Sequence, residues 1–231
     1  MAATEEWNTR IFPGRQLDYL VLGMPVPGVD VRGHNRFVTE ETKAFPNVSR
    51  LRLVTPECRL ADIEFDIKEY GFKGVYIHSF GYGLRVDDRK YYPLYETCVR
   101  MDVPVSMQMG HSAEAMESEV GRPMAMDKIA LDFPRLTLIG SHTGWPWSQE
   151  LIAMASKHRN VYMDISAWTP SFWDPWLVKE VDGRCRYKVM WGSNMMFARA
   201  GETFDEMDNL LTKEESKRAI LRENAVRVYK L

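Results

Sequence analysis

The sequence predicts an α/β barrel of parallel strands covered by helices, and three observations lead to this fold class. Short apolar segments that suit strands alternate with longer amphipathic segments that suit helices. Seven strand segments follow one another, which favours a barrel over an open sheet. The chain has 231 residues and contains no linker or low-complexity stretch, so we expect one barrel domain.

The predicted strands are short apolar runs that end at a glycine, a proline or a polar residue. The first, at residues 17–23, ends in a glycine, and the second, at residues 51–56, ends in a proline that cannot donate to a strand ladder. The remaining strands are predicted at residues 74–78, 103–108, 136–140, 161–164 and 189–192.

The predicted helices carry apolar side chains three or four positions apart. Ile63, Ile67 and Tyr70 show this spacing, and the segment stops at Gly71. Helices are therefore predicted at residues 34–45, 61–70, 91–101, 126–133, 148–158, 175–181 and 213–229.

A complete barrel of this kind has eight strand–helix units in about 250 residues, so one unit is missing or hidden near the N-terminus. We expect residues 1–16 to form an N-terminal extension and residues 17–231 to form a barrel without a regular first strand. The strands at 17–23 and 189–192 would then be edges, and exposed edges need covering. We expect residues 7–16 or a second subunit to lie across the gap.

Composition narrows the classes of function. Thirty basic residues against 32 acidic ones give a formal charge of −2, so we expect no nucleic-acid partner. No apolar run reaches the roughly 18 residues of a membrane span, and the first residues lack the order of a signal peptide, so we expect a cytoplasmic protein without a membrane partner. The three cysteines form no CxxC pair, and we expect them to be reduced. No dinucleotide fingerprint or GxSxG elbow is present.

Polar residues at strand ends are the first candidates for chemistry, because the carboxyl ends of parallel strands meet at one face of a barrel. His78, Gln108, His142, Asp164 and Asn194 stand at or near the ends of five predicted strands. His142 lies between Gly140 and Gly144, which leave backbone room for a ligand, and a histidine can accept and donate protons near neutral pH.

Other residues near strand ends are candidates for binding a substrate: His78, His111, Arg122, Trp145, Trp147 and Asp164. Each has a structural alternative. His78 can pack or cap a helix, and Arg122 can pair with Glu119 instead of a substrate carboxylate. Four tryptophans are dense around strand ends and are expected to shape an aromatic or apolar pocket, with packing at a subunit interface as the alternative: Trp145, Trp147, Trp168 and Trp173.

An ordered set of motifs identifies a resemblance: Ser141-His142-Thr143-Gly144, His158-Arg159-Asn160-Val161-Tyr162-Met163-Asp164, Gly192-Ser193-Asn194 and Glu223-Asn224-Ala225-Val226-Arg227-Val228-Tyr229. In these motifs residues 17–231 resemble the amidohydrolase-related branch of the amidohydrolase superfamily. The resemblance implies a (β/α)8 barrel with a divalent metal. The metal is held by a His-x-His or Glu-x-His pair on the first strand, a histidine after the fifth and an aspartate after the eighth, and the histidine of the sixth strand is a ligand or acid/base.

This sequence departs from that ligand set. No HxH or ExH pair occurs before residue 17, and Gln108 and Asn194 stand at the fifth-strand and eighth-strand positions, so only His142 remains. Neutral amides are poor zinc ligands. We therefore predict no metal and no other cofactor. Gln108 and Asn194 are either inert remnants or amide donors that polarise a carbonyl.

One subgroup of the family matches more closely. The run Met107-Gln108-Met109-Gly110-His111-Ser112 and the later Gly144-Trp145-Pro146-Trp147 resemble proteins that include hydrolases of 4-hydroxyphenyl-β-ketoacyl-CoA, whereas Met195-Met196 departs from their pattern. The resemblance implies hydrolytic carbon–carbon cleavage of a β-ketoacyl thioester or a related small carboxylated or aromatic substrate. His142 would be the general acid/base, and Gln108 and Asn194 would orient the carbonyl.

Three alternatives stay open, so whether the chain is an enzyme is not decided by its sequence. The first is a decarboxylase of an aromatic acid. The second is a metal-free barrel without catalytic activity that binds a ligand or serves as an assembly subunit. The third is a truncated reading frame whose missing part carried the first strand. We expect a small-molecule partner and a homo-oligomer.

Overall fold

The structure is a computed structural model that describes residues 6, 9–23, 28–194 and 200–231. Its strands are β1 (Tyr19–Val21), β2 (Val48–Val54), β3 (Gly74–Ile77), β4 (Val105–Gln108), β5 (Leu138–Ser141), β6 (Val161–Asp164) and β7 (Val189–Met190). Its α-helices are α2 (Val31–Thr42), α3 (Leu60–Tyr70), α4 (Ser79–Tyr82), α5 (Tyr92–Met101), α6 (Ala125–Asp132), α7 (Ser148–Lys157), α8 (Pro175–Val181), α9 (Ala200–Leu210), α10 (Glu214–Arg218) and α11 (Asn224–Tyr229).

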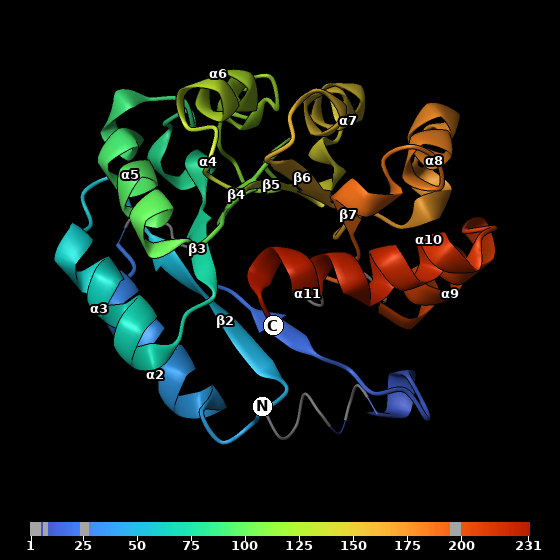
Figure 1. Cartoon of the computed structure of the whole chain (residues 1–231), viewed down its shortest axis with the longest axis horizontal. Helices are drawn as coiled ribbons and strands as arrows, with labels where there is room; N and C mark the ends of the chain where they lie inside the picture. The colour runs from blue at the N-terminus through green and yellow to red at the C-terminus, as the bar shows by residue number, and fades with distance from the viewer. Residues whose placement is uncertain (1–5, 7–8, 24–27, 195–199) are drawn as a thin grey trace.

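The strands form one parallel sheet in chain order, from β1 to β7, and the helices between them lie outside its curve (Figure 1). This confirms the predicted fold class, a TIM-type α/β barrel with seven recognisable strands. Within the described residues β7 and β1 form the two edges and do not pair, so the sheet curls without closing.

Alternation along the strands separates an inner face from an outer face. Outward side chains such as Val75 and Ile77 belong to the large core between strands and helices. Inward side chains form a second core with the C-terminal helix: Leu51, Leu53, Tyr76, Ile139, Met190, Val228 and Tyr229. The barrel interior is therefore filled, and the same alternation places Gln108 and Asp164 on the inner face.

The outer edge of β7 is satisfied by the C-terminal helical segment rather than by another strand. Asn224 Nδ2, which is fully buried, donates to the Val189 carbonyl at 2.7 Å and to the Arg186 carbonyl at 2.6 Å. Residues Ala219–Glu223 form one π-helical turn, in which the Asn224 N–H donates to the Ala219 carbonyl, five residues earlier. The Ile220 carbonyl is therefore available to accept the Trp191 N–H, at 2.9 Å. The helical segment thus satisfies two groups that an eighth strand would otherwise pair, the Val189 carbonyl and the Trp191 N–H.

The N-terminal segment also packs beside this opening. Phe12 contacts the rings of Trp191 and Phe204 edge-on, with centroids 6.2 and 5.6 Å apart. Residues 7 and 8 of the predicted cover lie outside the described residues. Beyond the end of β1, the Asn35 side chain pairs with the edge of β2. Its Nδ2 donates to the Leu53 carbonyl and its Oδ1 accepts the Leu53 N–H. The sequence predicted the N-terminal part of this cover but not the larger C-terminal part.

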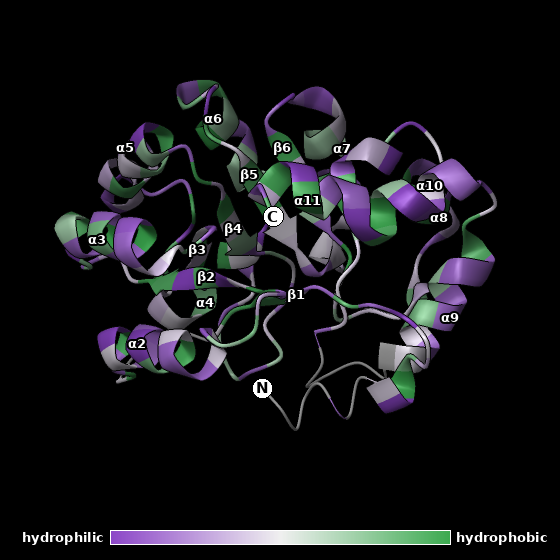
Figure 2. Ribbon diagram, turned by 60° about the horizontal axis from the view of Figure 1, so that its bottom comes forward, coloured by the Kyte–Doolittle hydropathy of each residue, from purple (hydrophilic) through white to green (hydrophobic). Residues whose placement is uncertain are grey.

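Several elements differ from the sequence prediction. Helix α4 was not predicted, and the single helix expected at residues 213–229 is divided into α10, a π-helical turn and α11. Helix α9 was not predicted, although Phe204, Met207 and Leu211 have the spacing of a buried helix face. Strand β2 begins at Val48, three residues earlier than expected, because its first half pairs with β1 and its second half with β3. The outer helices mix hydrophobic and hydrophilic positions, as helices that cover a sheet should (Figure 2).

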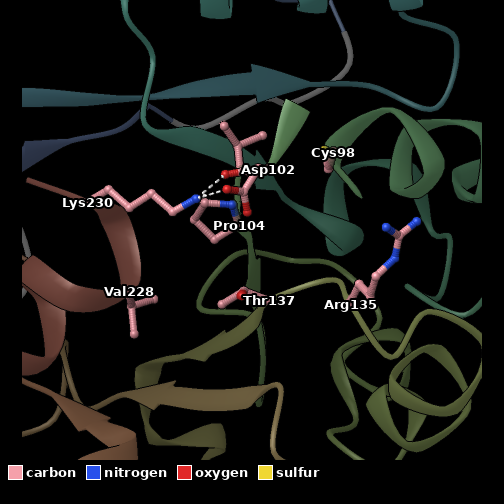
Figure 3. Close-up of a pocket in the computed structure, with 8 residues that line it drawn as sticks. Cys98, Asp102, Pro104, Arg135, Thr137, Val228 and Lys230 are labelled. Carbon is pink, nitrogen blue, oxygen red and sulfur yellow. Dashed lines mark hydrogen bonds and ion pairs between the residues drawn. The ribbon is translucent and has the colours of Figure 1, made fainter. Parts of the chain in front are cut away.

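The amino end of the barrel is closed by the end of the chain. Lys230 donates to the Asp102 carbonyl at 2.8 Å and forms an ion pair with its carboxylate, beside Pro104 and Val228 (Figure 3). The hollow beneath this pair holds about 20 Å³, room for little more than one water, so no substrate site is expected there. No helix in the described ranges has the length and apolarity needed to cross a bilayer.

Candidate active site

The candidate site lies at the carboxyl ends of β3 to β7, where four ionisable side chains form a cluster in which Glu114 acts on both histidines and Asp164 acts on His142. They are His78, Glu114, His142 and Asp164. Unusual backbone also gathers here: of the six described non-glycine residues with positive φ, His142, Thr143, Ala167 and Asn194 follow strand ends. Such strain is held only where the surrounding structure enforces it, and it is common at functional sites.

His142 follows β5 directly and is partly exposed. Its φ of 62° and that of Thr143, 56°, turn the chain sharply before α7. Burial lowers the pKa of His142 below 6.5, although the negative charges of Asp164 and Glu114 act in the opposite direction. The imidazole is therefore neutral at pH 7 and able to accept a proton.

Asp164 stands at the inward-facing end of β6, and its carboxylate is held by the Ser166 N–H at 2.7 Å. Gly192 passes close above it: a Cβ at that position would lie 3.1 Å from the Ser166 Cβ and 3.5 Å from Asp164 Oδ1. The lack of a side chain at Gly192 lets the segment leading to Asn194 approach the site. Asn194 is partly exposed with a φ of 45° and borders residues outside the described ranges.

Gln108 ends β4 and is nearly buried on the inner face. Tyr76 Oη donates to Gln108 Oε1 at 3.0 Å, which fixes the orientation of the amide. The Gln108 NH2 group is thus left as a donor. This arrangement is consistent with the predicted amide donor and was not readable from the sequence, because Tyr76 and Gln108 are 32 positions apart.

His78 caps a helix and still keeps a free donor. Its Nδ1 accepts the Gly81 N–H at 3.2 Å at the start of α4, so in the neutral ring the proton sits on Nε2. Nε2 is buried and has no hydrogen-bond partner among the described residues. Burial lowers the pKa of His78, with Glu114 opposing and His142 adding to the effect. The structure thus shows the capping role and leaves the Nε2–H group as a donor for a further partner.

Glu114 was missed by sequence reasoning. It lies in the loop after β4 and its carboxylate accepts the Ser112 hydroxyl at 2.6 Å. Burial opposes its ionisation, but the bond from Ser112 and the nearby His78 and His142 hold its pKa below the ordinary value. The only sequence signal was its place six residues after the end of a strand.

His111 belongs to an aromatic cluster beside these groups. The centroid of its ring lies 4.8 Å from that of Trp145 and 5.5 Å from that of Trp168, and the backbone N–H of His111 donates to the Trp145 carbonyl at 2.8 Å. The cluster borders a hollow of about 190 Å³ lined by Thr143, Trp145, Pro146, Ser148, Trp168, Phe172, Trp173 and Asp174. Three of the four tryptophans predicted to shape a pocket, Trp145, Trp168 and Trp173, therefore line one hollow, together with Phe172, which was not predicted.

Arg122 and Trp147 contact each other, and Arg122 is already paired with carboxylates of the protein. The Arg122 guanidinium makes bonds of 2.8 to 3.2 Å to the carboxylate of Glu150, a longer one of 3.4 Å to Glu119, and stands 5.7 Å from the ring of Trp147. A substrate carboxylate would have to compete with Glu150 for this guanidinium. The binding roles of Arg122 and Trp147 stay predictions.

The donors at the mouth do not fit a divalent metal held by three protein ligands. Among residues 6, 9–23, 28–194 and 200–231 no three His, Cys, Asp or Glu side chains are placed to share an ion. Gln108 Oε1, the amide atom best suited to a cation, is already taken by Tyr76. The prediction that the usual metal is not bound therefore stays open to a direct test.

Comparisons with known proteins give a family and a fold. The amidohydrolase family matches residues 27–231. An uncharacterised TIM-barrel protein of Bordetella bronchiseptica superposes with a TM-score of 0.82 at 21% identity, covering 100% of this chain and 83% of that one. No curated protein matches the sequence.

Two decarboxylases share the fold. The 2,6-dihydroxybenzoate decarboxylase of Rhizobium has a TM-score of 0.76 at 16% identity, covering 100% of this chain and 88% of that one. A dihydroxybenzoic acid decarboxylase of Polaromonas, with bound manganese and 2-nitroresorcinol, has a TM-score of 0.76 at 18% identity, covering 98% and 86%. Since the family match spans nearly all of the sequence, the chain belongs to the amidohydrolase family.

Proposed function

We propose that the chain cleaves a carbon–carbon bond in a small aromatic acid by decarboxylation, with His142 as the acid/base. The observation that carries this proposal is a neutral imidazole at a strand end, within reach of Asp164 and Glu114. The folds of the dihydroxybenzoate decarboxylases support this choice of reaction.

The proposed reaction transfers one proton through His142 and takes a second from water. Neutral His142 takes the proton of a phenolic hydroxyl and returns it to the ring carbon that bears the carboxylate. The bond to the carboxylate then breaks, carbon dioxide leaves, and the bonding electrons restore the ring as a phenolate, which takes a proton from water. Asp164 stabilises the transient imidazolium.

The neutral donors orient the substrate in this proposal. The Gln108 NH2 group and the His78 Nε2–H group both lie at the carboxyl ends of their strands. Each is a donor that a substrate oxygen can accept from. Asn194 supplies a second amide. Donors that are already in place form strong hydrogen bonds to a carboxylate or to an oxyanion that develops in the transition state.

The experiment is turnover of a panel of hydroxybenzoates, with phenol and carbon dioxide both quantified. Wild-type protein in D2O should place one deuterium at the carbon that carried the carboxylate, and His142→Asn should form product at least about 10²-fold more slowly. Product without deuterium at that carbon, or full activity of His142→Asn, would contradict the proposed mechanism.

Hydrolytic cleavage of a β-ketoacyl thioester, predicted from the sequence, remains a prediction that would use the same acid/base. Aryl β-ketoacyl thioesters in the same assay separate the two reactions, because hydrolytic cleavage adds one water and gives an aromatic carboxylic acid and a shorter acyl thioester, whereas decarboxylation releases carbon dioxide. Turnover of neither class by the wild type would favour the non-catalytic alternative.

A further inference from the structure

We propose that the aromatic hollow beside the mouth is a binding site for an organic cation, such as a trimethylammonium group. The hollow is lined by Trp145, Trp168, Phe172, Trp173, Asp174 and three small neighbours. None of His78, Glu114, His142 or Asp164 lines it, so the proposal goes beyond the proposed function and does not depend on it.

The lining has the chemistry of a cation site. Four of its eight residues are aromatic, and Asp174 is the only ionisable one, so the hollow carries a negative charge and no positive one. The faces of aromatic rings attract cations, and cages of such rings recognise quaternary ammonium groups. The volume of about 190 Å³ exceeds the 150 Å³ or so of an engineered cavity that takes up benzene, which suits a group of this size.

The lining is held in place before any ligand arrives. Trp173 Nε1 donates to the Trp168 carbonyl at 3.1 Å, and Asp174 Oδ1 accepts the N–H groups of Trp176 and Leu177, each at 2.9 Å. The Ser171 N–H is anchored to Glu206 on α9 at 2.8 Å. Ordering these groups therefore costs little on binding.

Exposure of the rings points to a ligand rather than to core packing. Phe172 is 69% exposed and Trp145 is 39% exposed, although both are large and apolar. Clustered exposed aromatic residues at a hollow mark a binding surface more often than isolated ones do. The carboxylate among them selects a cation over a neutral ring.

A matched pair of ligands tests the charge directly. Choline and 3,3-dimethyl-1-butanol have the same shape and differ only in the positive charge, so their affinities are compared by ligand-observed NMR at constant ionic strength. Choline should bind at least about fivefold more tightly, a ratio within the range expected for cation–π contacts. Phenol is measured as a neutral aromatic ligand. If choline binds with no higher affinity than the alcohol or than phenol, the proposal is overturned and the hollow is a pocket for neutral apolar groups.

Variants test the residues. Asp174→Asn keeps the helix cap, because asparagine caps as well as aspartate, and should weaken choline binding several-fold without changing the binding of the alcohol. Phe172→Leu should weaken choline binding as well. Trp176→Leu, on the same helix but outside the lining, is the control and should bind choline like the wild type. Unchanged choline binding by Asp174→Asn, or no choline binding by the wild type, would overturn the assignment.

Discussion

At the scale of single residues, the site is a set of groups whose protonation is controlled by burial. His78 and His142 are kept neutral, whereas Glu114 is kept charged. A neutral base beside a carboxylate is suited to proton transfer at pH 7. The roles of these residues lead to two predictions.

The first prediction concerns which side chain carries the reaction. His142→Asn should lower kcat by about 10² to 10⁴, the usual contribution of an acid/base, because no other described histidine occupies its position. Gln108→Ala and Asn194→Ala should each cost less, since two amides at one site can partly replace each other. The comparison is made by turnover of the best hydroxybenzoate, and a smaller effect of His142→Asn than of Gln108→Ala would reject these roles.

The second prediction concerns pH. The pKa of His142 lies below 6.5, so kcat/KM should be constant from neutral pH down to 6.5 and then fall as the imidazole is protonated. Asp164→Asn should move this acid limb to lower pH, because the Asp164 charge acts to raise the pKa of His142. The charges that act on the pKa of His78 are those of Glu114 and His142, so Asp164→Asn distinguishes the two histidines. An acid limb that stays in place in Asp164→Asn would assign it to another group.

At the scale of elements, the opening of the barrel is covered by a helix whose contacts depend on one π-helical turn. The extra residue in that turn aims the Ile220 carbonyl at Trp191 and places Asn224 over the end of β7. A strand edge is thereby protected by side-chain and helix groups instead of by a neighbouring strand.

The third prediction tests this cover. Asn224→Ala removes three hydrogen bonds of a fully buried side chain: the two that it donates to the Val189 and Arg186 carbonyls and the one that it accepts from Arg227. Each unsatisfied buried group costs about 1–3 kcal/mol, so the free energy of unfolding should fall by about 2–5 kcal/mol. Denaturant unfolding measures it, with exposed Asn209→Ala as the control. A loss no larger than that of the control would mean that the edge is satisfied in another way.

At the scale of the whole molecule, three histidines lose part of their hydration on folding and are held in neutral form, and this links stability to pH. Burial lowers the pKa of His34, His78 and His142 below 6.5. Between 6.5 and these lower values the unfolded chain binds protons that the folded chain does not, so protons favour unfolding.

The fourth prediction is that stability is unchanged by histidine titration above pH 6.5 and falls as the pH drops below it. His34→Asn should flatten this fall, because it removes one of the three histidines and lies outside the proposed acid/base cluster. Thermal unfolding of both proteins across this range gives the comparison. Parallel curves for the variant and the wild type would show that His34 does not contribute.

The fifth prediction concerns metal. Elemental analysis of purified protein should find no transition metal at one equivalent per chain, since amides stand at two of the usual ligand positions. Addition of manganese should leave both Tm and activity unchanged. One tightly held metal per chain would contradict the prediction and make His78, His142 and Asp164 the ligands to examine.

Local patterns in the sequence determined the fold class and the set of strand ends. Alternating apolar runs and helical spacings are properties of neighbouring residues, so the parallel strands and His78, Gln108, His142 and Asp164 at or beside their carboxyl ends could be predicted. Helix α9 had a readable apolar spacing as well and was simply not assigned.

Only the tertiary structure decided which groups meet. The sheet brings Tyr76 to Gln108, the loop after β4 brings Glu114 to the two histidines, and the chain end carries Asn224 to the edge of β7. These contacts join residues far apart in sequence, and their positions depend on the curl of the sheet and the path of each loop. No local spacing encodes such distances, whereas alternation and helical period are fixed by the geometry of the backbone itself.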